Sequence, residues 1–296
     1  MSVMAFIGVT TGQSMINQLF PLLAAELGIE DAELRGIDLP VDAPDAAYRD
    51  AVLRIRDDPE FTGGLVTTHK LAVFRSSADL FAELDSDARR LAEISCIASG
   101  PAGLAGYAKD PTTVRLALDL LLPPDYFAAG GQVLCLGAGG AGTALALCLR
   151  TRRLRAGRPD RIVLADVKPD RLAAVAELEL PDVETVLLDG PADALVAGLP
   201  AGSLIVNATG LGKDRPGSPL GDAAVFPRDS IAWDFNYRGD LRFLDQARNS
   251  SVRAVDGWDY FLHGWIEHIT QVYGRENSPH LFSRLAGIAA PYRPKP

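Results

Sequence analysis

The chain contains 296 residues, of which 48% are hydrophobic and 23% charged, and it carries a formal net charge of −9. This length exceeds what one hydrophobic core usually serves, so two domains are expected in an ordinary globular protein of enzyme size. The acidic balance argues against nucleic acid as a partner, because binding to backbone phosphates needs a positive surface.

Three cysteines, Cys96, Cys135 and Cys148, lie in apolar runs without the spacing of metal ligands, so no metal site is expected. Their odd number suits a reducing compartment, and we expect the protein in the cytoplasm. No run approaches the roughly 20 apolar residues of a membrane span, and the chain start lacks the basic region of a signal peptide. Neither an anchor nor a signal is expected.

Strands and helices alternate from the start of the chain. Short apolar runs predict strands, and apolar side chains at helical spacing predict helices between them. Because this alternation is typical of mostly parallel sheets, the first part is predicted to be an α/β domain. The expected strands are 4–9, 34–39 and 63–67, and the expected helices are 16–27, 46–56 and 69–81.

Two apolar runs, 94–98 and 104–107, flank the turn sequence Gly100-Pro-Ala-Gly103 and predict a hairpin. A helical segment at 112–122 then leads into a pair of prolines, after which the strand pattern restarts. This helix is the candidate hinge between two domains.

The second half repeats the βα pattern and predicts a Rossmann-like, doubly wound dinucleotide-binding domain, with strands at 132–136, 161–165, 184–188, 203–206 and 230–234. From Gly257 onward the chain is helical again, and Trp258 and Trp265 are expected in the core. We therefore expect a substrate-binding domain formed by 1–111 with returning helices of 241–296, and a cofactor domain at 112–240.

A glycine-rich loop directly follows the strand predicted at 132–136 and precedes a helix-forming run, which is the context of a dinucleotide fingerprint. The first glycine permits a tight turn, the second lets the backbone approach a pyrophosphate, and the third allows close helix packing. A glycine-rich turn without a ligand and the related loops of methyltransferases are the alternatives. We favour a dinucleotide held by Gly137, Ala138, Gly139, Gly140, Ala141 and Gly142.

Asp166 ends the next predicted strand, where a carboxylate can accept hydrogen bonds from both adenosine ribose hydroxyls. It would repel a 2′-phosphate, so NAD is favoured over NADP, although Lys168 and Arg171 lie close enough in sequence to neutralise a phosphate. A helix N-cap is the other interpretation of Asp166.

Several segments resemble those of the shikimate and quinate dehydrogenase family, in the same order and across nearly the whole chain. Val66-Thr-Thr-His-Lys70 is similar to the family's lysine segment, although it is one residue shorter and lacks the usual proline. Gly106-Tyr-Ala-Lys-Asp110 is similar to its Gly-x-Asn-Thr-Asp segment. The glycine-rich loop matches the family's cofactor loop, and Asn207 and Thr209 fall in a segment that borders the nicotinamide. Later similarities are Asp234-Phe-Asn-Tyr237 and Asp256-Gly257.

The resemblance implies that Lys70 and Asp110 form a catalytic dyad. Oxidation of a secondary alcohol sends a hydride to the nicotinamide and a proton away from oxygen, and an amine with a carboxylate can handle that proton. Taken alone, Lys70 would be an ordinary exposed lysine and Asp110 a helix N-cap. His69 is assigned at most a minor role.

The substrate-binding positions of the family are changed in this chain. Its serine pair corresponds to Ser14 and Ile16, its asparagine falls near Ser95, its threonine becomes Lys109, and its late glutamine falls near Gly264. Such losses of hydroxyl recognition should change the preferred substrate. Lys109 would either present a cation to a carboxylate or be solvated, and Tyr237 would line the pocket or pack at the domain junction. The substrate-binding candidates are Ser14, Thr67, Ser95, Lys109 and Tyr237.

The resemblance implies an NAD(P)-dependent oxidoreductase that transfers a hydride between the nicotinamide and a hydroxylated cyclic acid or related small molecule. The alternatives are shikimate dehydrogenase proper, and a non-catalytic nucleotide-binding regulatory protein of the same fold. The expected partners are a small-molecule substrate and, at most, a second copy of the chain in a homodimer.

Overall fold

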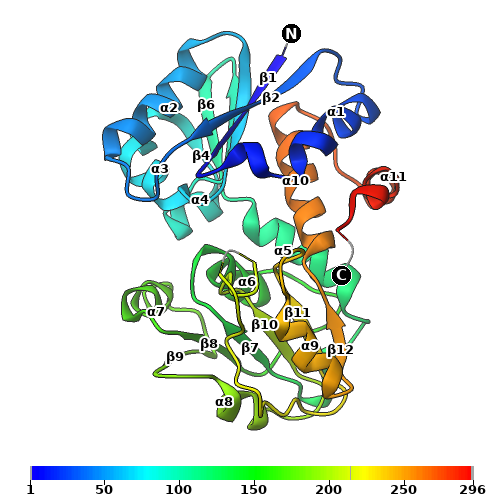
Figure 1. Ribbon diagram of the computed structural model, residues 1–296. Coiled ribbons are helices and arrows are strands. Elements are labelled where there is room, and N and C mark those ends of the chain that lie inside the picture. The colour runs from blue at the N-terminus through cyan, green and yellow to red at the C-terminus, as the bar shows by residue number, and fades with distance from the viewer. Residues whose placement is uncertain (1, 214, 295–296) are drawn as a thin grey trace. The chain divides into compact units, whose positions relative to one another are not determined.

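The computed structural model describes residues 2–213 and 215–294. This part of the chain separates into two compact units, the first formed by the chain up to Lys109 with Leu262–Arg293, the second by Asp110–Phe261. Each unit is built around its own six-stranded sheet (Figure 1).

The sheet of the first unit is mixed and has the order β2-β1-β3-β5-β6-β4. β1 is parallel to β2 and β3, whereas β5 is antiparallel to both β3 and β6 and forms the expected hairpin with β6. The strands are β1 (Ser2–Gly8), β2 (Ala32–Asp38), β3 (Phe61–Val66), β4 (Phe81–Leu84), β5 (Cys96–Gly100) and β6 (Gly103–Tyr107).

Helices cover this sheet through apolar faces that recur at helical spacing. Tyr48, Val52 and Ile55 of α2 are buried with Val73 of α3 in one core cluster with β1 and β3, and α2 and α3 lie side by side (Figure 1). The helices are α1 (Ile16–Glu26), α2 (Asp45–Asp57), α3 (Lys70–Ser77), α4 (Ser86–Leu91), α11 (Pro279–Ala289) and the greater part of α10 (Trp258–Val272).

The helix expected at 69–81 is shorter in the structure. α3 ends at Ser77, a 3-10 turn spans Ala78–Leu80, and Phe81 begins β4. The Ser76 hydroxyl donates to the Val73 carbonyl, and such local bonds compete with helix continuation. β4 is instead stabilised by parallel pairing with β6, a non-local contact that apolar periodicity does not reveal.

The sheet of the second unit is parallel throughout and confirms the predicted Rossmann-like fold. Its order, β12-β11-β10-β7-β8-β9, is that of the six-stranded dinucleotide-binding sheet. The strands are β7 (Val133–Leu136), β8 (Ile162–Asp166), β9 (Val183–Leu187), β10 (Leu204–Asn207), β11 (Ile231–Asp234) and β12 (Arg253–Val255). The helices are α5 (Asp110–Leu121), α6 (Gly140–Thr151), α7 (Pro169–Ala176), α8 (Asp193–Ala197) and α9 (Arg242–Asn249).

The segment 241–261 differs from the sequence expectation, which assigned it to the first domain. β12 pairs in parallel with β11, and α9 buries Phe243, Leu244 and Ala247 in the core of the second unit. A strand of three residues is too short to be recognised from its apolar pattern.

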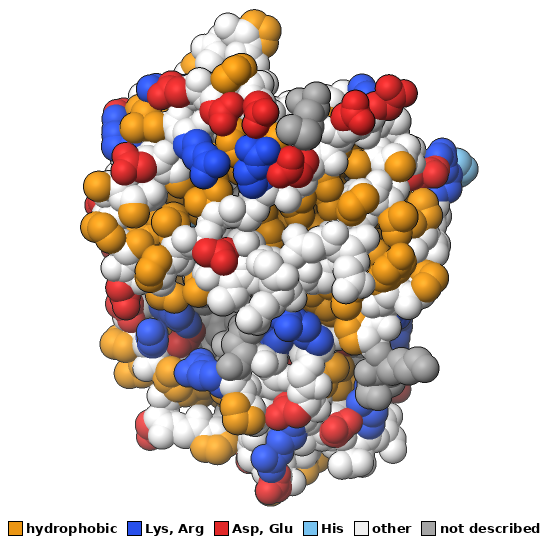
Figure 2. Space-filling view, turned by 45° about the horizontal axis from the view of Figure 1, so that its top comes forward, with side chains coloured by type: hydrophobic (Ala, Val, Ile, Leu, Met, Phe, Trp, Pro, Cys, Tyr) orange, Lys and Arg blue, Asp and Glu red, His pale blue; other side chains and the backbone are white. Residues whose placement is uncertain are grey.

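Charged side chains of both signs share the molecular surface. Figure 2 shows Lys and Arg scattered among Asp and Glu on the face it draws, so the negative net charge does not form a single acidic field there. No helix among residues 2–213 and 215–294 is long and apolar enough to cross a membrane. The three cysteines are free and buried, and the reducing compartment inferred from them stays a prediction.

Candidate functional site

The glycine-rich loop joins β7 to α6 in the second unit, and its three key glycines have different surroundings. Gly137 has a φ of +105°, and a Cβ built on it would lie 2.7 Å from the Ala208 carbonyl oxygen. A Cβ on Gly142 would collide with the Gly137 carbonyl. Both residues must therefore be glycine for the protein itself to fold this way.

Gly139 is the exception. The nearest atom to a Cβ built there is Nη1 of Arg171, at 3.9 Å, so the protein leaves this side of the loop open. Gly139 is also the N-cap of the 12-residue helix α6 and has no side chain with which to cap it. An open glycine at a helix N-terminus is what a pyrophosphate requires for close approach, so the residues present fit a dinucleotide.

Asp166 is 5% exposed at the end of β8 and faces this loop. Its Oδ2 accepts from the Ala138 backbone N–H at 2.8 Å and lies 3.4 Å from Nη1 of Arg171. Its Oδ1 accepts from the Lys168 N–H at 2.9 Å. The carboxylate thus holds the loop to β8, and the predicted N-cap role is not seen, since Lys168 is the N-cap of α7.

The segment Asn207-Ala-Thr-Gly210, called the Asn207 segment below, lies beside the glycine-rich loop, at the carboxyl end of β10. β10 pairs with β7, and the Ala208 N–H donates to the Leu136 carbonyl at 2.7 Å. The fully buried Asn207 accepts at Oδ1 from the Thr209 N–H and hydroxyl, at 3.1 and 2.7 Å. The switch of strand order between β7 and β10 is where doubly wound sheets bind ligands, and the structure brings the cofactor candidates together there.

In the first unit, the structure brings Lys70, Ser95 and Lys109 close together through the backbone. Lys70 is the first residue of α3, and its carbonyl accepts from the Ile94 N–H at 3.1 Å. The next residue, Ser95, is fully buried, and its Oγ accepts from the Lys109 N–H at 2.8 Å. The adjacent Asp110 begins α5 and is 6% exposed.

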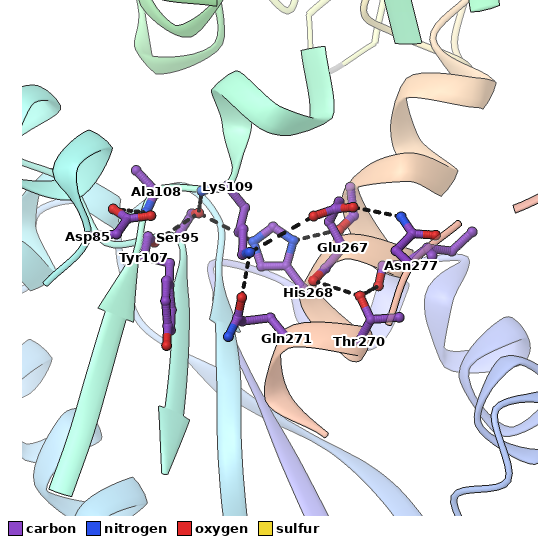
Figure 3. A network of polar contacts seen from close by, with 12 residues as sticks. Asp85, Ser95, Tyr107, Ala108, Lys109, Glu267, His268, Thr270, Gln271 and Asn277 are labelled. Atoms are coloured by element: carbon purple, nitrogen blue, oxygen red, sulfur yellow. Dashed lines mark hydrogen bonds and ion pairs between the residues drawn. The ribbon is translucent and has the colours of Figure 1, made fainter. Parts of the chain in front are cut away.

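The Lys109 side chain joins a polar network with α10 (Figure 3). Its Nζ donates to Oε1 of Gln271 at 2.6 Å, lies 3.9 Å from Oε2 of Glu267, and sits 5.2 Å from the centroid of the Tyr107 ring. With a side chain only 15% exposed, Lys109 is held inside the unit and is not a solvated surface lysine.

His268 completes this network on the same helix. Its Nδ1 lies 2.5 Å from the Gly264 carbonyl, which can only accept, so Nδ1 carries the proton. Its Nε2 lies 3.3 Å from Oγ of Ser95 (Figure 3). The Ser95 hydroxyl, which is also 3.3 Å from the Tyr107 carbonyl, is therefore surrounded by protein partners.

The remaining candidates occupy separate places. Thr67 follows β3, and its N–H donates to the Ile7 carbonyl at 3.0 Å. Ser14 lies half-buried in the turn before α1, where its N–H donates to Thr11. His69 is 3% exposed and its Nε2 bonds the Leu39 carbonyl, which gives it a structural role. Tyr237 packs against the rings of Trp258 and Phe261 within the second unit.

Sequence reasoning missed several polar residues that the structure places against the candidates: Glu267, His268 and Gln271 against Ser95 and Lys109, and Asp234 and Asn236 around Asn207. Polar residues at i, i+1 and i+4 of a largely apolar helix were the available signal for the first group. Asp234 and Asn236 lie in a segment noted for its resemblance and for Tyr237, and neither residue was assigned a role.

Comparisons with known proteins identify relatives by sequence and by fold. No protein-family model matches the chain. It is 36% identical over 258 residues to a curated protein from Methylobacterium radiotolerans named shikimate dehydrogenase (NADP(+)), which covers 84% of this chain and 86% of that protein.

Two solved structures share the fold over nearly the full length. Shikimate 5-dehydrogenase from Thermus thermophilus, in complex with NADP(H) and shikimate, has a TM-score of 0.74 at 24% identity, covering 98% of this chain and 100% of that one. Quinate dehydrogenase from Corynebacterium glutamicum, in complex with NAD, has a TM-score of 0.75 at 21% identity, covering 98% and 99%.

Proposed function

This chain belongs to the shikimate dehydrogenase family, and from that premise we propose that it is an NAD(P)-dependent oxidoreductase acting on a hydroxylated cyclic acid or related small molecule. The observation that carries the proposal is the open position at Gly139, at the helix N-terminus where the strand order of the parallel sheet reverses. A glycine-rich turn without a ligand does not require open space beside Gly139, whereas a bound pyrophosphate requires it.

When bound, the nicotinamide supplies the hydride acceptor or donor. In the proposed role, Gly139 and the first turn of α6 bind the pyrophosphate through backbone N–H groups. Asn207 and Thr209 border the nicotinamide side. Lys70 takes the proton from the substrate hydroxyl oxygen during oxidation and returns it during reduction, and Asp110 balances its charge.

We propose NAD as the preferred cofactor, because Asp166 places a buried negative charge beside the loop. A carboxylate has about four acceptor positions, and the donors from Ala138, Lys168 and Arg171 leave capacity for a ribose hydroxyl. A 2′-phosphate would meet like charge there. The proposed preference for NAD differs from the cofactor in the name of the homologue, which is NADP(+).

Paired titrations of NAD and NADP test the preference. The unmodified protein should bind NAD more tightly, and Asp166→Ser should narrow or reverse the ratio. Tighter binding of NADP by the unmodified protein would mean that Lys168 and Arg171 outweigh the carboxylate.

The preferred substrate is proposed to differ from shikimate. Ile16 has no hydrogen-bonding group, and the Ser95 hydroxyl is already bonded by the Lys109 N–H and surrounded by His268 and Tyr107. Each underpaired neutral group of shikimate would weaken binding by roughly 1–3 kcal/mol, so several together discriminate strongly.

The test is steady-state turnover of shikimate, quinate and a panel of hydroxylated cyclic acids with each cofactor. We expect at least one compound to be turned over well and shikimate poorly. A kcat/KM for shikimate of about 10⁴ M⁻¹s⁻¹ or more would contradict the altered-substrate proposal. Cofactor binding without any turnover would favour the non-catalytic nucleotide-binding alternative.

A further inference from the structure

A buried carboxylate lies at the carboxyl end of β11, next to the Asn207 segment. Asp234 is fully buried, and each of its oxygens faces a donor. Oδ1 accepts from the Asn236 backbone N–H at 2.8 Å, and Oδ2 accepts from Nδ2 of Asn207 at 3.0 Å. A buried charge persists in a protein only where such bonds satisfy it, so this arrangement is specifically built.

Asp234 favours the same orientation of the Asn207 amide as the Thr209 N–H and the Leu211 carbonyl do. A carboxylate can only accept, so the end of the amide that faces Asp234 must be the nitrogen. The oxygen is then directed to Thr209, where it accepts from the N–H and the hydroxyl. If the amide were reversed, an oxygen would face a carboxylate and a nitrogen would face a backbone N–H.

The same carboxylate reaches the far end of the loop through Asn236. Nδ2 of Asn236 donates to the Leu211 carbonyl at 3.0 Å, and Nδ2 of Asn207 donates to the same carbonyl at 3.2 Å. The Leu211 N–H in turn donates to the Thr209 hydroxyl at 3.1 Å. The turn 209–211 is therefore held at both ends by two asparagines that are both bonded to Asp234.

We propose that Asp234 is a positioning residue for cofactor binding, which in its ionised form holds the turn 209–211 in the conformation that receives the nicotinamide half. The inference rests on the proposed function, because that function assigns Asn207 and Thr209 to the cofactor. Asp234 acts through these neighbours and is not itself a catalytic residue.

Burial is the main cause that raises the pKa of Asp234 to about 7; the charge of Asp256 acts in the same direction, and hydrogen bonds from Asn236 and Asn207 act in the opposite direction. β10 and residues 208–212 carry no ionisable side chain. On β12, Arg253 donates to the Leu121 carbonyl.

Protonation would disturb the network because all the neighbouring groups are donors. A protonated carboxyl presents an O–H on one oxygen, and that oxygen then faces either Nδ2 of Asn207 or the Asn236 N–H. One of the two bonds is lost. The turn is then held more weakly, so cofactor affinity should fall as the pH drops through 7.

The experiment is titration calorimetry of NAD with the whole protein at about one unit below and one unit above the pKa of about 7. The wild type should bind about tenfold more weakly at the lower pH, the effect of one hydrogen bond to a charged group. Asp234→Asn has the shape of the protonated residue, so it should bind weakly at both pH values.

Asp193→Asn is the matched control. Asp193 also accepts a backbone N–H, from Gly221 at 2.8 Å, in the same unit but away from the Asn207 segment. This variant should keep the pH ratio of the wild type, and thermal unfolding of both variants shows whether they fold.

The wild-type measurement does not depend on a variant that folds. The inference would be overturned if the wild type bound NAD equally well at the two pH values. It would also be overturned if Asp234→Asn showed the same ratio of NAD affinities between the two pH values as the wild type. Either result would leave the proposed function intact. Absence of NAD and NADP binding by the wild type at both pH values would overturn the proposed function and this inference with it.

Discussion

At the scale of single residues, the glycines of the glycine-rich loop differ in whether the fold itself requires them. Gly137 and Gly142 are required by neighbouring backbone carbonyls, whereas the space beside Gly139 is open. The spacing of the fingerprint loop predicted the tight turn at Gly137 and the close helix packing at Gly142, and the approach of a pyrophosphate to Gly139 stays a prediction. The neighbours of Ser95 and Lys109 could not be predicted this way, since Glu267, His268 and Gln271 lie more than 150 residues further along the chain.

Gly139→Val should abolish dinucleotide binding while leaving the fold intact. A Cβ at this position meets only the flexible end of Arg171 in the protein, but a valine side chain would occupy the path of the pyrophosphate. Titration calorimetry with NAD and NADP measures the loss, and Gly142→Val, which collides with backbone, is the contrasting variant that should unfold. Unchanged affinity in Gly139→Val would remove the loop from the cofactor site.

Lys70→Ala should lower turnover by at least about 100-fold, the usual contribution of a positioned acid or base, with cofactor affinity largely unchanged. Lys70→Arg keeps the charge but cannot release a proton near neutral pH, so it should be nearly as inactive. Steady-state rates on the best substrate of the panel, with cofactor affinity measured separately, make the comparison. Near-normal turnover in either variant would reject Lys70 as the proton-transferring group.

At the scale of elements, apolar runs were predictable as strands, whereas short strands without such a run were not. Each predicted strand of the second unit corresponds to an observed strand. β7, β8, β10 and β11 are buried and mostly apolar, as is typical of parallel strands, whereas β9 lies at the sheet edge and has no buried residue. β4 and β12, with four and three residues, depend on non-local pairing and were missed. The separate helix α11 lay inside a region predicted only as generally helical, although Ser278 before Pro279 is a clear start signal.

Ser278→Ala should destabilise the first unit by about 1 kcal/mol, the typical effect of losing an N-cap. The Ser278 hydroxyl accepts from the Leu281 N–H at 3.1 Å, and alanine cannot replace this bond. Ser278→Asp, which retains an acceptor and adds a charge favourable at a helix N-terminus, should restore stability. Urea unfolding followed by circular dichroism gives the difference, and an alanine variant as stable as the wild type would show that the cap is redundant.

At the scale of the whole molecule, ionisation of buried groups links stability to pH. Asp234 has a folded-state pKa raised to about 7, well above the ordinary value of 3.8, so the folded state binds its proton more tightly than the unfolded state. The tighter binding of this proton stabilises the folded state fully when the pH lies below the pKa that Asp234 has in the unfolded chain. This stabilisation is lost as the pH rises through the pKa that Asp234 has in the folded protein.

The free energy of unfolding of the wild type should therefore decline, relative to Asp234→Asn, as the pH rises from about 4 to about 7. The expected slope approaches about 1.4 kcal/mol per pH unit, the limit for one proton bound by the folded state and not by the unfolded state. Denaturant unfolding of both proteins across this range, followed by tryptophan fluorescence, measures the difference. Parallel curves for the two proteins would show that Asp234 titrates at its ordinary value.

The order of the two sheets also bears on self-assembly. Four strands, β2, β4, β9 and β12, stand at sheet edges, where unpaired backbone groups can recruit a strand from another molecule. β2 carries the Glu33–Arg35 ion pair, β4 carries the exposed Glu83, Glu184 of β9 pairs with Arg161, and β12 has only three residues. Charge and brevity make these edges poor templates for amyloid-like growth. A homodimer would accordingly have to form through helices and loops rather than by continuing a sheet.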